Sequence, residues 1–284
     1  MTGMRGMDVV RIIRGMAGSL MLPLMAVSAL AAGPEPWQIG MQKAATPVRE
    51  RMDALNNELL VIITGITLFV LVLLLYVMVR FNARRHPVPS KTAHNSLIEV
   101  IWTLAPALIL VIVAVPSFQL LFYADRIPSA EMTINVKGHQ WNWEYTYPDQ
   151  GGLHFTSLPL SDEDVAKGGK LRLLDVDNPL VVPAGTNIRI LVEGEDVIHS
   201  WFVPTLGVQE YAVKGHTNES WMRVDQPGMY YGQCNQICGV GHPFMPIAVK
   251  VVPKTEFETW VTEAKQKFAL TPAPDALHLA QSAQ

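Results

Sequence analysis

The sequence predicts a membrane-anchored protein in which a two-helix transmembrane hairpin is followed by a Greek-key β-sandwich or barrel. Two long apolar stretches lie in the first 124 residues, a basic loop separates them, and short β-rich runs follow from Met132. The 284 residues are 49% hydrophobic and only 17% charged, a composition that excludes an intrinsically disordered chain. The formal net charge of −3 argues against a nucleic-acid-binding protein.

The N-terminus has the pattern of an export signal. The apolar run Met16–Leu30 follows three arginines, Arg5, Arg11 and Arg14. The run ends in small residues of the A-x-A type, so we expect residues 1–31 to be a signal peptide cleaved near Ala31. A short membrane anchor is the alternative, although the run is short for a span of ~20 residues. Residues 32–58 would then form an exported segment in an oxidising compartment.

Two further apolar stretches predict transmembrane helices over residues 59–80 and 97–124. Leu59–Val79 contains no charged residue, and the second stretch is interrupted by Glu99 and by two prolines. Each stretch is long enough to cross ~30 Å of hydrocarbon. The connecting loop, residues 81–96, belongs to the most basic part of the mature chain. The positive-inside rule therefore places this loop in the cytoplasm and both ends of the hairpin on the outer side.

Glu99 has two compatible interpretations. It lies three residues after Ser96, which fits a capping box with Ser96 as the N-cap of the second helix. An acidic side chain at the cytoplasmic edge of a membrane can instead collect protons for a partner subunit.

The outer part of the chain, residues 130–265, predicts an all-β domain. Runs rich in Val, Ile, Thr, Tyr and Trp alternate with turns that contain Pro and Gly. The runs are Met132–Val136, Trp141–Tyr147, Asn187–Val192, Trp221–Val224 and Ile247–Val252. Short strands at this spacing favour a Greek-key sandwich or barrel. Lys254–Phe268 is expected to form a helix against the sandwich, and residues 266–284 are expected to form a mobile tail.

The segment Cys234–Met245 concentrates metal-binding side chains. Its pattern is C-x₃-C-x₃-H-x₂-M, and His199 lies 35 residues before the first cysteine. Soft sulfur ligands combined with imidazole favour copper, and a methionine argues against zinc. Each residue alone has an ordinary structural explanation; two exported cysteines, for example, can form a local disulfide. Their combination on one loop predicts a copper site.

The number of cysteines bears on the kind of copper site. A mononuclear blue-copper site needs two histidines, one cysteine and a weak axial methionine, which leaves one cysteine over. Two cysteines can instead bridge two copper ions, with one histidine at each end. Gly239 and Gly241 allow the loop to fold tightly enough for its ligands to converge.

These motifs resemble those of subunit II of bacterial haem–copper cytochrome c oxidase along nearly the whole mature chain. The matching segments are Glu99–Thr103, Gly138–Tyr145, Val176–Asn178, Asp196–Trp201 and Tyr230–Pro246, in the order and spacing of the family. The resemblance implies a cupredoxin-like domain that holds two copper ions as the dinuclear Cu(A) centre. The ligands implied by the match are His199, Cys234, Cys238, His242, Met245 and the backbone carbonyl of Gln236.

Residue 236 departs from the family pattern. The family commonly has Glu at this position, where the side chain helps to bind a magnesium ion at the interface with subunit I. Gln236 supplies the same backbone carbonyl to copper but removes a hard anionic ligand from magnesium. Whether a magnesium ion binds at this interface is therefore not decided by the sequence.

The resemblance also implies a function. As an electron-transfer subunit, the chain would accept electrons from cytochrome c through Trp141 and pass them from Cu(A) to haem in subunit I. Oxygen reduction to water and proton pumping would take place in that partner, and Glu99 matches a position at the entrance of a proton-uptake path. Strand alternation alone does not distinguish Trp141 from Trp143, because it allows one inside and one outside the sandwich.

The charge of the outer part fits a basic electron donor. Residues 125–265 carry 18 acidic and 11 basic side chains, a net charge of −7. Such a surface would steer a basic cytochrome c toward the domain in a salt-sensitive manner. The candidate docking acids are Asp175, Asp177, Glu193, Glu195 and Asp196.

Two other classes of protein share some of these features. A quinol oxidase subunit II would have the hairpin and sandwich but serve as a copper-free structural subunit, which the full ligand set argues against. A copper-delivery or storage protein would not need Trp141 or Glu99. Nitrous-oxide reductase has a similar copper motif together with a large second domain.

The resemblance also implies partners and a location. The expected partners are subunit I, further oxidase subunits and cytochrome c. The expected location is the bacterial inner membrane, with the Cu(A) domain in the periplasm.

Overall fold

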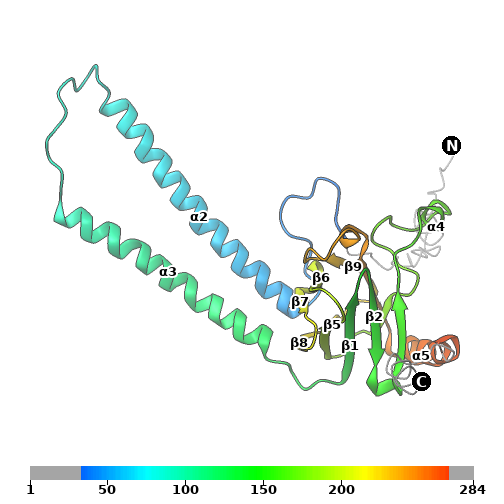
Figure 1. Cartoon of the computed structure of the whole chain (residues 1–284). Helices are drawn as coiled ribbons and strands as arrows, with labels where there is room; N and C mark the ends of the chain where they lie inside the picture. Colours follow the sequence, from blue (N-terminus) through cyan, green and yellow to red (C-terminus); the bar gives the residue numbers. More distant parts are fainter. Residues whose placement is uncertain (1–32, 269–284) are drawn as a thin grey trace, which may run out of the picture.

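The computed structural model describes residues 33–268 and consists of a helical hairpin that leads into a β domain (Figure 1). Helix α2 spans Pro47–Arg80 and helix α3 spans Ser96–Asp125. The expected signal peptide, residues 1–31, lies outside the described residues. Of the expected tail, residues 266–268 belong to the final helix α5, Lys254–Phe268, and the remainder lies outside the described range.

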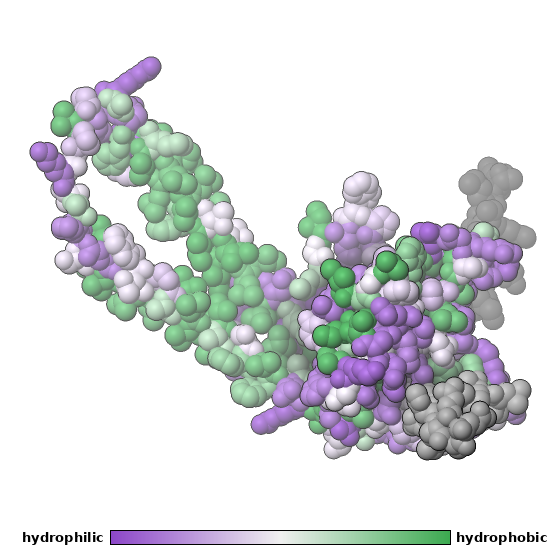
Figure 2. All heavy atoms as spheres, viewed as in Figure 1, coloured by the Kyte–Doolittle hydropathy of each residue, from purple (hydrophilic) through white to green (hydrophobic). Residues whose placement is uncertain are grey.

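The two long helices have the properties of membrane spans. Each contains a window that is apolar enough to cross a bilayer, and these windows are 0% buried within the chain. Apolar side chains cover the hairpin on the face shown in Figure 2, whereas polar side chains dominate the β domain. A helix that is hydrophobic on all sides requires lipid or other protein around it. Helix α2 begins at Pro47, twelve residues before the uncharged stretch, so its first turns extend beyond that stretch.

The N-cap of α3 is Asn95, and the prediction of Ser96 was wrong by one residue. The Asn95 side chain accepts hydrogen bonds from the backbone N–H groups of Leu97 and Ile98, at 3.1 and 3.2 Å. The Glu99 carboxylate accepts a hydrogen bond from the Asn95 backbone N–H at 3.2 Å. The reciprocal capping by Glu99 is therefore confirmed, although the carboxylate reaches back four residues instead of three because Ser96 is already helical.

The β domain consists of two five-stranded sheets. The first has the order β3-β2-β1-β5-β8 and the second has the order β4-β10-β9-β6-β7. The strands are β1 Met132–His139, β2 Asn142–Tyr147, β3 Leu153–Ser157, β4 Leu180–Pro183, β5 Ile188–Gly194, β6 His199–Val203, β7 Val208–Ala212, β8 Asn218–Met222, β9 Gly228–Cys234 and β10 Pro246–Val252. Short helices α4 (Asp162–Ala166), η1 (Pro148–Gln150), η2 (Pro204–Leu206) and η3 (His242–Phe244) lie in the connections.

The predicted sandwich is confirmed, and each of the five β-rich runs overlaps a strand, although Trp141 precedes β2 and Val224 follows β8. Alternate residues of each inner strand point into the core, as in β5, where burial alternates along the strand. Trp143, Tyr145 and Trp201 are the largest of the fully buried side chains. The pairings β1–β5 and β4–β10 are parallel, and the other strand pairs are antiparallel. Strands that are distant in sequence therefore lie side by side, as a Greek key requires.

Specific contacts join the β domain to the outer ends of the hairpin. The guanidinium of Arg51 lies 3.6 Å from the ring centroid of Tyr123, and this ring packs edge-on against Trp221. The indole N–H of Trp221 donates to the Ala124 carbonyl at 3.0 Å. At the start of α2, the Thr46 hydroxyl donates to the Leu206 carbonyl at 2.7 Å. These contacts fix the β domain relative to the membrane helices.

Candidate metal centre

The strand arrangement of the second sheet brings the predicted ligands together. Strand β9 ends at Cys234 and pairs with β6, in which Trp201 lies opposite Cys234. His199, two residues before Trp201, therefore begins its strand on the same side of the sheet. The loop after β9 returns to β10, and it is closed by a hydrogen bond of 3.0 Å from the Cys234 backbone N–H to the Met245 carbonyl.

The two cysteines face each other as free thiols. Their sulfur atoms are 3.8 Å apart, well beyond the ~2.05 Å of a disulfide bond. A ring nitrogen of His199 lies within 4.8 Å of both sulfurs, and the three residues are buried. On the other side, Nδ1 of His242 is 3.6 Å from the Cys238 sulfur. The structure thus gathers two thiols and two imidazoles in one cluster.

The His199 ring is oriented with one nitrogen left for a ligand. Nε2 lies 2.7 Å from Oδ1 of Asp196, while Nδ1 is buried and has no hydrogen-bond partner among residues 33–268. A buried polar atom left unpaired costs about 1–3 kcal/mol. A hydrogen bond from Nε2–H to the carboxylate leaves the lone pair on Nδ1, which is the arrangement of a metal-binding histidine. Thiolates, imidazoles and a thioether together form a donor set that fits copper.

The ionisation of the two thiols is unequal. Burial by itself would raise the pKa of Cys234, but the His199 imidazole and the Ser200 backbone N–H stabilise the thiolate and lower this pKa below its usual value. Burial and the nearby negative charge of Cys234 raise the pKa of Cys238. Burial opposes the protonated form of His199, yet the interactions with Cys234 and Asp196 outweigh it and raise the histidine pKa. In the metal-free protein, Cys234 therefore loses its proton first.

The two remaining predicted ligands contact Cys234 through their backbone carbonyls. Met245 is almost completely buried, and its backbone carbonyl pairs with Cys234 as described above. The Cys234 thiol lies 3.4 Å from the backbone carbonyl of Gln236, within hydrogen-bonding range for sulfur. All six residues that the resemblance implied as ligands therefore lie at the start of β6, at the end of β9 or on the β9–β10 loop.

Trp141 lies directly against the metal-binding loop. Its indole N–H donates to the Cys238 carbonyl at 3.0 Å, and the Gln140 side-chain amide donates to the same oxygen at 2.9 Å. A Cβ atom at Gly241 would lie 2.2 Å from the Trp141 ring, so only a glycine permits this contact. Trp143, by contrast, is fully buried in the core. The structure therefore distinguishes the two tryptophans that strand alternation left equivalent.

The five candidate docking acids differ in exposure. Asp175 is only 5% exposed, and its carboxylate accepts hydrogen bonds from the Leu171 backbone N–H and the Tyr231 hydroxyl. This burial contradicts the prediction that Asp175 is a docking residue, because a donor protein cannot reach it. The burial of Asp175 could not be predicted from the sequence, because the residue lies in an irregular segment with no periodicity to indicate it.

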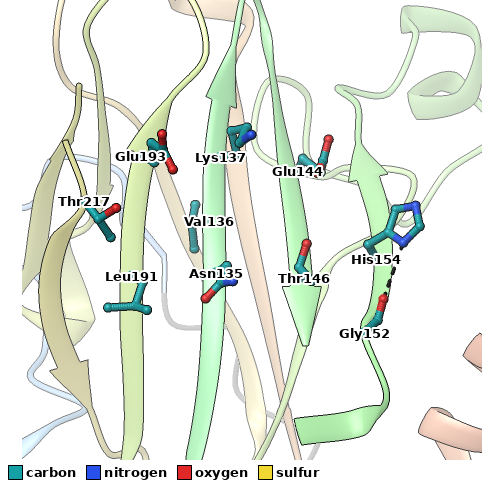
Figure 3. Close-up of a pocket in the computed structure, with 10 residues that line it drawn as sticks. All are labelled: Asn135, Val136, Lys137, Glu144, Thr146, Gly152, His154, Leu191, Glu193 and Thr217. Atoms are coloured by element: carbon teal, nitrogen blue, oxygen red, sulfur yellow. Dashed lines mark hydrogen bonds between the residues drawn. The ribbon is translucent and has the colours of Figure 1, made fainter. Parts of the chain in front are cut away.

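The other four acids are at least partly exposed. Asp177 accepts hydrogen bonds from the backbone N–H groups of Leu158 and Asn178, and Glu195 forms an ion pair with Lys137 at 3.3 Å. Lys137 also lies between Glu193 and Glu144 in a row across β5, β1 and β2 (Figure 3). The row borders a shallow pocket of about 350 Å³ on the outer face of the first sheet. Sequence reasoning overlooked Lys137, whose charge offsets part of this acidic surface.

Comparisons with known proteins identify the family of this chain. Residues 132–252 match the family model described as cytochrome c oxidase subunit II, periplasmic domain, and residues 34–120 match the corresponding transmembrane domain. The chain belongs to the cytochrome c oxidase subunit II family. It is therefore a subunit of a haem–copper terminal oxidase, with two candidate membrane helices and a periplasmic domain.

Individual relatives show the same family. A probable cytochrome c oxidase subunit 2 from Rickettsia bellii is 49% identical over 248 residues, covering 87% of this chain and 91% of the relative. A cytochrome c oxidase subunit 2 from Oenothera berteroana is 42% identical over 240 residues, covering 82% and 93%. The crystal structure of the periplasmic domain of subunit II from Bradyrhizobium japonicum is 46% identical, with a TM-score of 0.47 over 50% of this chain and 99% of that domain.

Proposed function

We propose that this subunit II carries a dinuclear Cu(A) centre that accepts electrons from cytochrome c and passes them to haem in subunit I. The observation that carries the proposal is the cluster of two free thiols and two imidazoles, in which Nδ1 of His199 is buried without a partner among the described residues. A buried imidazole nitrogen without such a partner, beside two free thiols and a second imidazole, fits a metal centre better than it fits a protein core.

The predicted ligands would hold the copper at this centre. Cys234, Cys238, His199 and His242 would bind the two copper ions, and Met245 and the Gln236 carbonyl would complete the set. Bound copper would supply the one-electron redox chemistry that protein side chains lack. The tight loop and the buried surroundings would keep water out and hold the ligands in one geometry, so that little rearrangement accompanies each electron transfer.

Trp141 is our candidate for the point where electrons enter. Its indole contacts the loop between Cys238 and His242 and remains partly exposed, so one side chain contacts both the solvent and the ligand-bearing loop. Cytochrome c would dock over this residue, steered by the net negative charge of the domain and by Asp177, Glu193, Glu195 and Asp196. The electron would then pass through the Cys238 backbone, which accepts the indole hydrogen bond.

The remaining assignments extend the proposal to the whole chain. Residues 1–31 would be removed as a signal peptide and residues 32–58 exported. Residues 59–80 and 97–124 would span the bacterial inner membrane, joined by a cytoplasmic loop over 81–96. The periplasmic domain would cover residues 130–265. Glu99, which caps α3 at the cytoplasmic edge, would also mark the entrance of the proton-uptake path of subunit I.

The test is metal analysis of the purified oxidase complex, with copper EPR and visible spectra. The proposal expects two copper ions in this chain, with one unpaired electron shared equally by both nuclei. Cys234→Ser would remove a ligand and should abolish the signal. Met132→Leu is the neutral control, because Met132 lies in the core outside the cluster. A signal from a single copper nucleus, or a Cys234–Cys238 disulfide without copper in the purified complex, would exclude Cu(A). A magnesium assay of the same sample would decide whether Gln236 still supports that ion.

A further inference from the structure

We infer that Asp196 is a positioning residue for the copper ligand His199, and that one carboxylate thereby joins this ligand to the turn that carries Trp141. The inference rests on the proposed Cu(A) function. It gives Asp196 a role inside the redox site in addition to the charge that it contributes to the surface of the domain.

Both oxygens of the Asp196 carboxylate are occupied within the protein. Oδ1 lies 2.7 Å from Nε2 of His199 and accepts a hydrogen bond of 2.7 Å from the Val197 backbone N–H. Oδ2 accepts a hydrogen bond of 2.7 Å from the Gln140 backbone N–H. The side chain is 33% exposed, whereas His199 is fully buried. A carboxylate with three short contacts is held in one orientation.

The contact with Asp196 determines what the His199 ring can do. A proton on Nε2 is stabilised by the carboxylate, so Nδ1 keeps its lone pair for a ligand. Packing also limits the ring, since a Cβ atom at Gly138 would lie 3.1 Å from Cδ2 of His199, the carbon bonded to Nε2. The ring is therefore fixed by the hydrogen bond to Asp196 and by its packing against Gly138 of β1.

The same carboxylate reaches the residue that precedes Trp141. The Gln140 backbone N–H donates to Asp196, and the Gln140 side chain donates to the Cys238 carbonyl, which also accepts the Trp141 indole N–H. Asp196, Gln140 and Cys238 thus link the two ends of the cluster through three hydrogen bonds. A shift of Asp196 would move the His199 ring and the Trp141 turn together.

The charge of Asp196 also acts on the copper potential. A negative charge hydrogen-bonded to a ligand makes that ligand more basic and stabilises the more positive, oxidised form of the metal. Replacement by a neutral side chain should therefore raise the reduction potential. Removal of such a partner commonly lowers metal affinity by about 10–100-fold.

The experiment uses the purified oxidase complex with Asp196→Asn, Asp196→Glu and, as a control, Glu193→Gln. Asp196→Asn removes the charge with almost no change of shape, and Asp196→Glu keeps the charge but lengthens the side chain. Glu193 is a partly exposed acid of the same sheet that borders the Figure 3 pocket, so its change controls for loss of a nearby charge. The measurements are copper content, copper retention against a chelator, histidine nitrogen couplings in pulsed EPR, reduction potential, and the salt dependence of cytochrome c oxidation.

We expect Asp196→Asn to raise the potential, to alter the nitrogen couplings and to release copper faster, by more than the Glu193→Gln control does. Asp196→Glu should alter the nitrogen couplings even though the charge remains. Variants that keep wild-type couplings, potential and copper retention, and that change only the salt dependence, would show a docking acid and overturn the inference. If Asp196→Asn does not assemble, Asp196→Glu decides by the same criteria. Absence of a dinuclear copper signal in the wild-type complex would instead refute the proposed function.

Discussion

The indole N–H of Trp141 donates to the backbone carbonyl of Cys238 at 3.0 Å, although the two residues are 97 positions apart in sequence. A predicted surface aromatic and a predicted metal ligand are therefore in direct contact. The contact depends on two glycines in the loop, because side chains at these positions would meet the indole. The geometry of this contact leads to the first two predictions.

Gly241→Ala should disrupt the metal-binding loop. The added methyl group would lie 2.2 Å from the Trp141 ring, so the loop or the indole must move. Overpacking of this kind costs about 1–3 kcal/mol. We expect a lower thermal unfolding midpoint and a lower copper content in the purified complex. Val240→Ala, which trims a neighbouring exposed side chain, is the control and should leave both unchanged; equal behaviour of the two variants would contradict the packing argument.

Trp141→Phe should slow the transfer of electrons from cytochrome c without removing the metal. Phenylalanine keeps an aromatic ring but loses the N–H that bonds to the Cys238 carbonyl. Stopped-flow measurement of copper reduction by cytochrome c tests this expectation, with the copper spectrum as the check on the centre. Trp37→Phe is the matched control, since Trp37 is almost fully exposed and lies far from the cluster in sequence. An unaltered reduction rate in Trp141→Phe would remove this residue from the path.

Met245→Leu should change the copper spectrum and reduction potential while assembly remains intact. The substitution conserves volume in a nearly fully buried position, so it should cost less than about 1.5 kcal/mol. It replaces a thioether with a group that cannot bind copper, and weak axial ligands tune the potential of such sites. A spectrum and potential identical to those of the wild type would exclude Met245 from the ligand set.

The two thiols of the copper-free protein should react at different pH. The pKa of Cys234 is lowered, so its reactive thiolate appears at a lower pH than in a free cysteine. The pKa of Cys238 is raised, so its thiolate appears only at higher pH. Alkylation with iodoacetamide across a pH series, followed by peptide mass spectrometry, should find Cys234 modified first as the pH increases. Simultaneous modification would contradict this order, and Cys238→Ser checks the assignment.

Asp175→Asn should destabilise the β domain and leave the salt dependence of cytochrome c oxidation unchanged. The buried carboxylate accepts hydrogen bonds from Leu171 and Tyr231, and the amide of Asn presents a donor to one of these partners. Mismatched buried groups cost about 1–3 kcal/mol. Chemical denaturation measures the loss of stability, and Glu163→Gln, a change of an exposed acid, is the control. A weaker salt dependence in Asp175→Asn with normal stability would restore the docking role.

Local patterns in the sequence were sufficient where the interactions are themselves local. The uncharged stretch Leu59–Val79 is long enough by itself to require a hydrophobic environment. Lys254–Phe268 forms the expected helix. The N-cap of α3 was misplaced by one residue because both Asn95 and Ser96 are good caps, and only the backbone conformation distinguishes them.

Sequence patterns are sufficient to establish the membrane hairpin, the β-rich outer domain and the spacing of the copper-type ligands. These features depend on apolar length, on strand periodicity and on the side chains within a short loop. The tertiary structure alone decided that Asp175 is buried, that Trp141 rather than Trp143 contacts the loop, and that Asp196 bridges His199 and Gln140. Each of these depends on a contact between distant parts of the chain: Asp175 with Tyr231, Trp141 with Cys238, and Asp196 with Gln140. No short-range pattern in the chain encodes which distant segments become neighbours.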